Sequence, residues 1–179
     1  MIKIHLGCGK RNFGKGWIHI DAVDYPHISC NSVFPLPFDD GVADLIYASH
    51  LFEYFDREEA LSVLKEWRRV IKPGGILRLA VPDFNVISKL YTEDLYQIDT
   101  FLGPLYGKMQ MNDEIIYHKT CYDFRSLKDV LRCAGFVKIQ RYDYRETEHA
   151  SVDDHSQAFL PHMNKDSGVL ISLNVEAIK

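Results

Sequence analysis

The sequence has no long hydrophobic run, no leader-like start and no excess of positive charge. No apolar run approaches the roughly 18 residues that a transmembrane helix needs. The first residues carry no basic stretch ahead of an apolar one, so no signal peptide is expected. Lys and Arg total 21 against 25 Asp and Glu, a formal net charge of −4, which does not favour nucleic acid as a partner. We therefore expect a cytoplasmic protein with no membrane span and no nucleic-acid partner.

Metal and disulfide patterns are also missing. Cys8, Cys30, Cys121 and Cys133 form no C-x-x-C pair, so reduced thiols are expected. The zincin pattern is absent, and no metal site is expected. With 46% hydrophobic and 26% charged residues in 179, the composition is that of one globular domain over residues 1–179.

Short apolar runs alternate with helical patterns along the chain. Strands are expected at 2–6, 17–20, 43–48, 76–81, 136–144 and 169–178. Helices are expected after the N-cap residues Asp56, with Glu59 as its capping-box partner, and Asp123. Residues 84–122 should hold two or three short helices broken at Gly103-Pro104 and Gly107. This order predicts an α/β fold: a Rossmann-like, mostly parallel sheet covered on both faces, with the last strand antiparallel.

A glycine-rich loop follows the first strand. Gly7 and Gly9 give a G-x-G pair, but Asn12 replaces the third glycine of the dinucleotide fingerprint, and Asp21 comes too early for its acid. Asp21 nevertheless ends the second strand, at the edge where open α/β sheets bind ligands, and its two oxygens can accept bonds from both hydroxyls of a ribose. A tight turn with an ordinary turn aspartate is the alternative.

The connection between these two strands is short. Its seven residues, 10–16, reach at most about 23 Å, and returning along a four-residue strand takes about 13 Å. We therefore expect a vestigial first helix of about one turn here.

Several motifs, taken together, resemble one family. "HLGCG" (5–9), "PLPF" (35–38), "ADLIYASHLFEYF" (43–55), "EWRRVIKPGG" (66–75) and "LRLAVPDF" (77–84) are similar in order and spacing to class I S-adenosylmethionine-dependent methyltransferases, above all the short bacterial and viral members. The resemblance covers roughly residues 3–84. It implies S-adenosylmethionine as cofactor and S-adenosylhomocysteine as product.

The resemblance also implies roles for individual residues. Gly7, Cys8 and Gly9 would let the backbone approach the methionine part of the cofactor, Asp21 would bind the ribose, and Asn31 would lie near the adenine. Ser49 and His50, which follow the expected strand 43–48, would face the sulfonium. Together with Lys10, these residues form the expected cofactor-binding site.

Two departures from the family pattern affect the site. Tyr54 stands where the family's S-H-x-x-E-H motif ends in histidine. The shortened first helix would also give a weaker dipole for the cofactor's carboxylate. Lys10 or Arg11 could replace it with a direct charge, or both could be solvated loop cations.

Candidate catalytic residues lie at strand ends and in a late polar segment. His50 could act as a base on the acceptor or could orient Glu53, and Asp83 could accept a substrate proton or cap a helix. His155 and His162 lie in the segment 146–165, which together with the insert 84–122 is the expected substrate lid. Alternatively, a second subunit of a homodimer could supply the lid.

The function expected from these features is methyl transfer to oxygen or nitrogen of a small-molecule or sugar/glycan acceptor. A non-catalytic S-adenosylmethionine sensor or partner subunit is the alternative. A base-modifying methyltransferase is disfavoured because "SHLF" stands where N/D-P-P-Y/F would be. An NAD-dependent oxidoreductase is disfavoured by Asn12 and the early Asp21.

Overall fold

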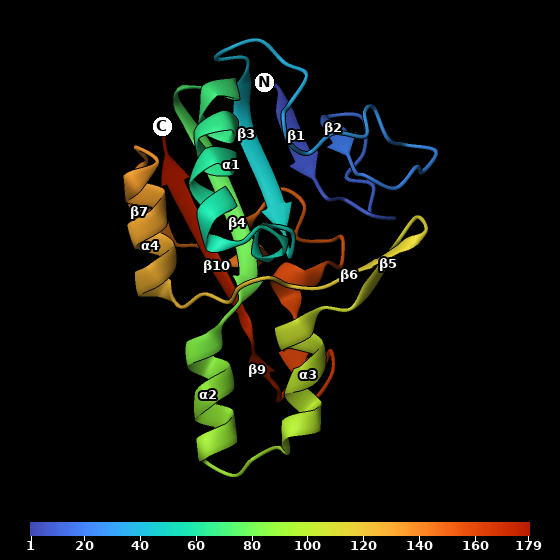
Figure 1. Cartoon of the computed structure of the whole chain (residues 1–179), viewed down its shortest axis with the longest axis vertical. Helices are drawn as coiled ribbons and strands as arrows, with labels where there is room; N and C mark the ends of the chain where they lie inside the picture. The colour runs from blue at the N-terminus through green and yellow to red at the C-terminus, as the bar shows by residue number, and fades with distance from the viewer.

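A computed structural model describes all 179 residues and contains a six-stranded mixed sheet in the order β2-β1-β3-β4-β10-β7. Five strands run in one direction, and β10 lies antiparallel between β4 and β7, as the arrows of β4 and β10 show (Figure 1). The strands of this sheet are β1 Lys3–Leu6, β2 Trp17–Ile20, β3 Ala43–Ser49, β4 Ile71–Pro82, β7 Val137–Arg141 and β10 Ser172–Ile178. The expected fold class and the antiparallel last strand are confirmed.

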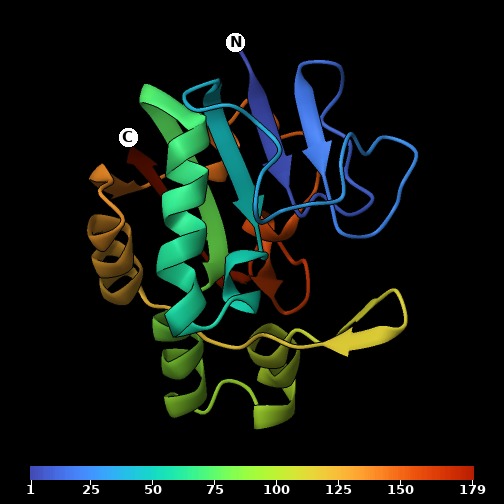
Figure 2. The same cartoon turned by 45° about the horizontal axis from the view of Figure 1, so that its top comes forward.

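Two capped helices cover one face of the sheet. Helix α1 (Arg57–Val70) begins at Asp56, whose side chain forms the expected capping box with Glu59. Helix α4 (Phe124–Cys133) begins at Asp123, which forms a second capping box with Ser126. Figure 2 shows both helices on the same side of the sheet, where they bury a continuous apolar core. Satisfying the first N–H groups of each helix fixes where it starts.

The insert after β4 lies at the carboxyl end of the parallel strands (Figure 1). It contains α2 (Phe84–Thr92), α3 (Ile98–Tyr106) and a hairpin of β5 (Met109–Met111) and β6 (Glu114–Ile116). The expected break at Gly103-Pro104 is wrong, because α3 runs through Pro104 and ends at Gly107, whose φ is +50°. A proline this close to the helix end removes only one backbone bond of the last turn.

No helix forms between β1 and β2, so the expected single turn is wrong and residues 10–16 are turn and loop. An aromatic cluster covers this part of the sheet instead. The ring of Phe13 stacks between His5, with centroids 4.1 Å apart, and His149, with centroids 4.4 Å apart. Trp17 and Tyr47 pack around this stack. A segment from the far end of the chain thus fills the space that a first helix would occupy.

Buried hydrogen bonds hold this late segment, residues 146–165, to the sheet. The short helix η2 (Tyr144–Glu146) leads into the segment, and η3 (His155–Gln157) lies within it. Asp154 accepts from the Tyr47 hydroxyl on one oxygen. Its other oxygen accepts from Ser156, through the backbone N–H at 2.9 Å and the hydroxyl at 2.6 Å. Asn174 donates to the Ser156 carbonyl at 2.9 Å. A short ladder of β8 (Phe159–Leu160) and β9 (Val169–Leu170) follows.

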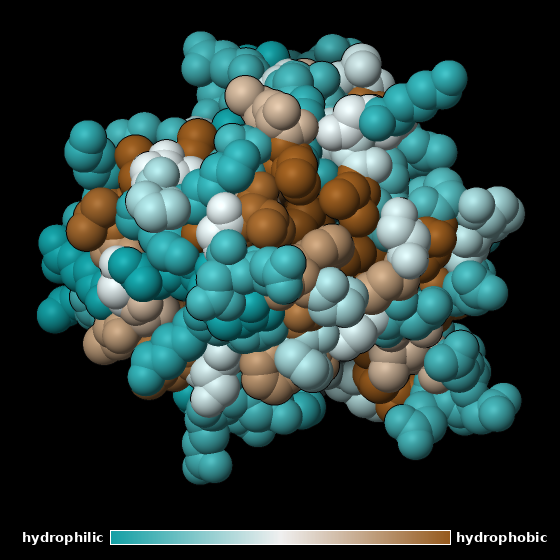
Figure 3. Space-filling view, turned by 90° about the horizontal axis from the view of Figure 1, so that it is seen from above, coloured by the Kyte–Doolittle hydropathy of each residue, from teal (hydrophilic) through white to brown (hydrophobic).

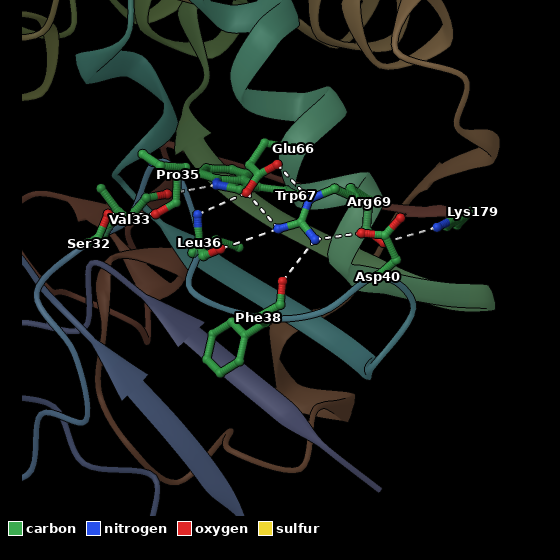
Figure 4. Close-up of polar contacts among 10 residues, drawn as sticks. All are labelled: Ser32, Val33, Pro35, Leu36, Phe38, Asp40, Glu66, Trp67, Arg69 and Lys179. Atoms are coloured by element: carbon green, nitrogen blue, oxygen red, sulfur yellow. Dashed lines mark hydrogen bonds and ion pairs between the residues drawn. The ribbon is translucent and has the colours of Figure 1, made fainter.

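The proline-rich segment 32–40 is held by the side chains of α1 (Figure 4). Arg69 donates to the carbonyls of Leu36 and Phe38 and pairs with Asp40 and Glu66. Trp67 adds a bond of 3.0 Å to the Val33 carbonyl (Figure 4). The side chains of one helix therefore hold three carbonyl groups of this irregular segment.

We expect Arg69→Lys to lower the free energy of unfolding by about 1–3 kcal/mol, because lysine keeps the charge but cannot make the branched set of bonds. Urea unfolding measures this loss. Arg132→Lys on the exposed side of α4 is the control and should change little. A loss no larger than that of the control would show that the Arg69 bonds do not hold the segment.

The amino ends of the parallel strands lie at the opposite end of the molecule from the insert. Figure 3 views this end and shows a largely hydrophilic surface around one patch of hydrophobic residues. No helix is both long and apolar enough to cross a membrane.

Candidate active site

The glycine loop has a backbone that only glycine adopts without strain. Gly7 and Gly9 have φ values of +62° and +55°, in the left-handed region. A Cβ on Gly7 would lie 3.0 Å from the side chain of Leu51, and one on Gly9 would lie 3.9 Å from Arg11. At Gly7 the loop therefore lies close against Leu51, in the chain that follows β3. At Gly9 the backbone of the loop has open space beside it.

Asp21 ties this loop to the end of β2. One carboxylate oxygen accepts from the Gly9 backbone N–H at 2.7 Å, and the other accepts from the Val23 N–H at 2.9 Å. Each oxygen keeps a further lone pair for a ligand. The Asp21 N–H reaches the Cys30 carbonyl at 3.4 Å, so exposed Asn31 lies beyond β2, on the side away from β1.

Cys8 contributes through its backbone and not through its sulfur. The side chain is buried, and burial raises the pKa of the thiol to about 12. The thiol is therefore neutral at physiological pH and is no nucleophile.

Arg11 is held above the loop by the late segment. Its Nε donates to the Asp153 carbonyl at 3.0 Å, and one terminal nitrogen lies 3.5 Å from the His155 ring. Its other terminal nitrogen lies 3.9 Å from where a Cβ on Gly9 would stand. Lys10 is exposed and makes no comparable contact. Of the two cations, Arg11 is the one placed to meet an anionic group at the loop.

His50 follows β3 at the same edge. Its φ of +49° is unusual for a residue with a side chain, and its N–H donates to the Ala80 carbonyl of β4. Its Nε2 lies 3.3 Å from the Ser172 hydroxyl, and the ring of His155 lies 5.1 Å away. Burial lowers the pKa of His50 well below its ordinary value.

Glu53 and His118, which are not among the predicted catalytic or cofactor-binding residues, complete this group. Glu53, in η1 (Phe52–Tyr54), is completely buried, and neither carboxyl oxygen has a hydrogen-bond partner. His50 Nδ1 lies 3.6 Å and His118 Nε2 lies 3.5 Å from the same oxygen. Burial raises the pKa of Glu53 to about 8. His118 comes from the connection after β6, where its ring packs on Gly107.

Of the remaining predicted residues, Ser49 lies in the site, Asp83 caps a helix and His162 lies on the surface. Ser49 is buried beside His50, and its hydroxyl has no partner. Asp83 is buried and caps α2 through the Asn85 N–H, while its second oxygen lies 3.2 Å from Arg141, so both oxygens are engaged. His162 is exposed beyond β8. No three His, Cys, Asp or Glu side chains are grouped to hold a metal ion.

Part of the chain is similar in sequence to known methyltransferases. Residues 6–79 match the sequence model of a family described as "Methyltransferase domain". The demethylmenaquinone methyltransferase of Staphylococcus haemolyticus is 29% identical over 126 residues, 64% of this chain and 49% of the relative. That of Staphylococcus epidermidis is 33% identical over 113 residues, 58% and 44%. The chain spans about half the length of these curated relatives.

Solved structures share the fold at low identity. A SAM-dependent methyltransferase from Archaeoglobus fulgidus has a TM-score of 0.60 at 14% identity, over 99% of this chain and 86% of the other. The 1,6-didemethyltoxoflavin-N1-methyltransferase of Burkholderia thailandensis was solved with 1,6-didemethyltoxoflavin and S-adenosylhomocysteine. It has a TM-score of 0.57 at 13% identity, over 99% and 70%.

Proposed function

We propose that this chain, whose residues 6–79 match a methyltransferase-domain model and whose fold is shared by a solved SAM-dependent methyltransferase, is a class I S-adenosylmethionine-dependent methyltransferase that methylates a small-molecule acceptor. The observation that carries this proposal is the bridge from Asp21 to the Gly9 and Val23 N–H groups. It fixes a carboxylate with free lone pairs beside an open glycine loop, at the carboxyl end of parallel strands, where a nucleoside binds in such sheets.

The residues present fit the cofactor. Asp21 would hold the ribose, Gly7 and Gly9 would admit the methionine portion, and Arg11 would pair with its carboxylate. The Ser49 hydroxyl, buried without a partner, offers a polar group that a ligand would satisfy. When bound, the cofactor supplies an electrophilic methyl group.

The chain's own part in the reaction is to align the acceptor and exclude water. Alignment alone can supply several kcal/mol. The insert 84–122 lies at the carboxyl end of the strands (Figure 1), and we infer that it covers the acceptor. Of the late segment 146–165, we assign only the part around exposed His155 and His162 to the acceptor, because His149 and Asp154 are buried against the sheet.

The acceptor that we propose is a small protic molecule, methylated on oxygen or nitrogen. A sugar unit of a glycan and a quinol, the latter suggested by the names of the curated relatives, are both in this class. Production of S-adenosylhomocysteine with a panel of sugars, quinols and amines identifies the acceptor and separates an enzyme from a sensor that binds without transfer.

The test of the proposed function is isothermal titration calorimetry with three ligands. S-adenosylmethionine and S-adenosylhomocysteine should both bind, and NAD should not. Failure of both sulfur nucleotides to bind would overturn the proposal, and binding of NAD alone would favour an oxidoreductase.

We expect Arg11→Gln to weaken S-adenosylmethionine binding roughly 5- to 30-fold, because a charge-assisted bond to the carboxylate is lost. Lys10→Gln is the matched control and should change the affinity less than about threefold. Equal losses in the two variants would show that the loop acts through general positive charge and that Arg11 has no specific contact.

A further inference from the structure

Glu53 with His50 and His118 forms a buried cluster whose chemistry the proposed function does not use. The side chains come from η1, from the end of β3 and from the connection after β6. Their exposed fractions are 0%, 11% and 5%. Glu53 is also held by its backbone, because its carbonyl accepts from the Lys119 N–H at 2.9 Å. The carboxyl group is thus fixed between two imidazoles with no water-exposed alternative.

Hydrogen bonds determine which nitrogen of His50 carries its proton. The Asn174 amide donates to the Ser156 carbonyl, so its oxygen is turned toward Ser172, 3.0 Å away. A carboxamide oxygen only accepts, so the Ser172 hydroxyl donates to it and is left to accept from His50 Nε2 at 3.3 Å. His50 Nδ1, which faces Glu53, then carries a bare lone pair.

His118 approaches the same carboxyl oxygen of Glu53, with its Nε2 3.5 Å away, and neither carboxyl oxygen has a hydrogen-bond partner. A carboxylate anion that faces the His50 lone pair would be repelled by it and would be buried without a donor, which is costly. The cluster therefore holds one proton, and burial raises the pKa of Glu53 to about 8.

We propose that Glu53 and its two histidines are a buried proton store that empties when the cationic cofactor binds and refills when methyl transfer leaves a neutral product. The inference rests on the proposed function. A positive charge at the edge of the sheet favours the Glu53 carboxylate, because opposite charges attract strongly where water is excluded. Loss of that charge restores the protonated form.

Atoms and charges balance in this scheme. The acceptor oxygen or nitrogen bonds to the methyl carbon as the sulfur–methyl bond breaks, and the electron pair of that bond stays on sulfur. The acceptor loses one proton, which the exposed His155 imidazole can take and pass to solvent, and Glu53 takes up one proton when the positive charge is gone, so protons balance. Glu53 is a positioning residue here, because it is completely buried and does not touch the reacting atoms.

Other charged or titratable groups face the cluster from each neighbouring element. Arg11 and His155 face His50 from the glycine loop and the late segment. Tyr54 and Tyr122 lie near Glu53, and Arg57 of α1 stacks on the Tyr122 ring at 4.3 Å. Burial raises the pKa of both tyrosines to about 12, so neither titrates near neutral pH.

Calorimetry in two buffers with different ionisation enthalpies tests the store. At pH 7, binding of S-adenosylmethionine to the wild-type protein should release a measurable fraction of a proton. Binding of S-adenosylhomocysteine, which carries the same amino and carboxyl groups, should release less. Glu53→Gln should abolish the difference between the two ligands, and Glu58→Gln, an exposed matched control, should keep it.

The outcomes separate this inference from the proposed function. If neither ligand binds, the proposed function fails. If both bind and the released proton is the same for the two ligands, or the difference persists in Glu53→Gln, the proton store is wrong while the function stands. Should Glu53→Gln fail to fold, infrared difference spectra of the wild-type protein decide. The protonated-carboxyl band must be weaker with S-adenosylmethionine than with S-adenosylhomocysteine, and equal bands overturn the inference.

Discussion

Asp21→Ala is expected to weaken S-adenosylmethionine binding by roughly 1–3 kcal/mol, about 5- to 150-fold, because a partly buried charged acceptor is removed. The variant also releases the Gly9 and Val23 N–H groups that Asp21 now holds, so the glycine loop loses its link to β2. Both effects act in the same direction. Calorimetric titration of the variant measures the loss.

Asp24→Ala serves as the control, because Asp24 is exposed three residues further along the same connection. It should bind the cofactor as the wild-type protein does. Asp21→Asn should fall between the two, since one acceptor oxygen remains while the charge is lost. Unchanged affinity in Asp21→Ala would remove Asp21 from the cofactor site.

His149→Phe should make the protein less sensitive to acid. Burial lowers the pKa of His149 to about 4, and neither of its ring nitrogens has a partner. As the pH falls below 6.5, this histidine becomes protonated in the unfolded chain but stays neutral in the folded protein, so the folded state loses stability. The loss in the free energy of unfolding is about 2 kcal/mol by pH 5. Phenylalanine keeps the stack on Phe13 and removes the titrating group.

The measurement is the difference in unfolding free energy between His149→Phe and the wild-type protein at pH 7 and pH 5. The difference is needed because Glu53 also makes the stability of the wild-type protein depend on pH, in the opposite direction. Its pKa is raised from 4.5 to about 8, so the folded state loses stability as the pH rises between these values. The variant should gain about 2 kcal/mol over the wild-type protein between the two pH values. His162→Phe, at an exposed position, should not, and a constant difference in His149→Phe would contradict the buried stack.

Local sequence rules predicted the parts of the fold that depend on neighbouring residues. Asp56 and Glu59 are three residues apart, so a capping box could be expected before any contact was known. Asp21 could be assigned to the sheet edge because the strand before it ends there. The length of residues 10–16 correctly excluded a full first helix, but the single helical turn predicted there is wrong.

Contacts between distant parts of the chain could not be predicted in this way. Phe13 and His149 stack across 136 positions, and no periodicity links them. Glu53 was visible within S-H-x-x-E, three residues from His50, but its second histidine, His118, lies in an insert with no motif. Tertiary packing decides such pairs, and burial then gives them their chemistry.

The most direct test of the account is a crystal structure of the protein with S-adenosylhomocysteine. We predict the ribose hydroxyls on the Asp21 carboxylate, the adenine beside Asn31 and the amino-acid end over Gly7 and Gly9 near Arg11. Nucleoside density away from Asp21, or at another edge of the sheet, would contradict it.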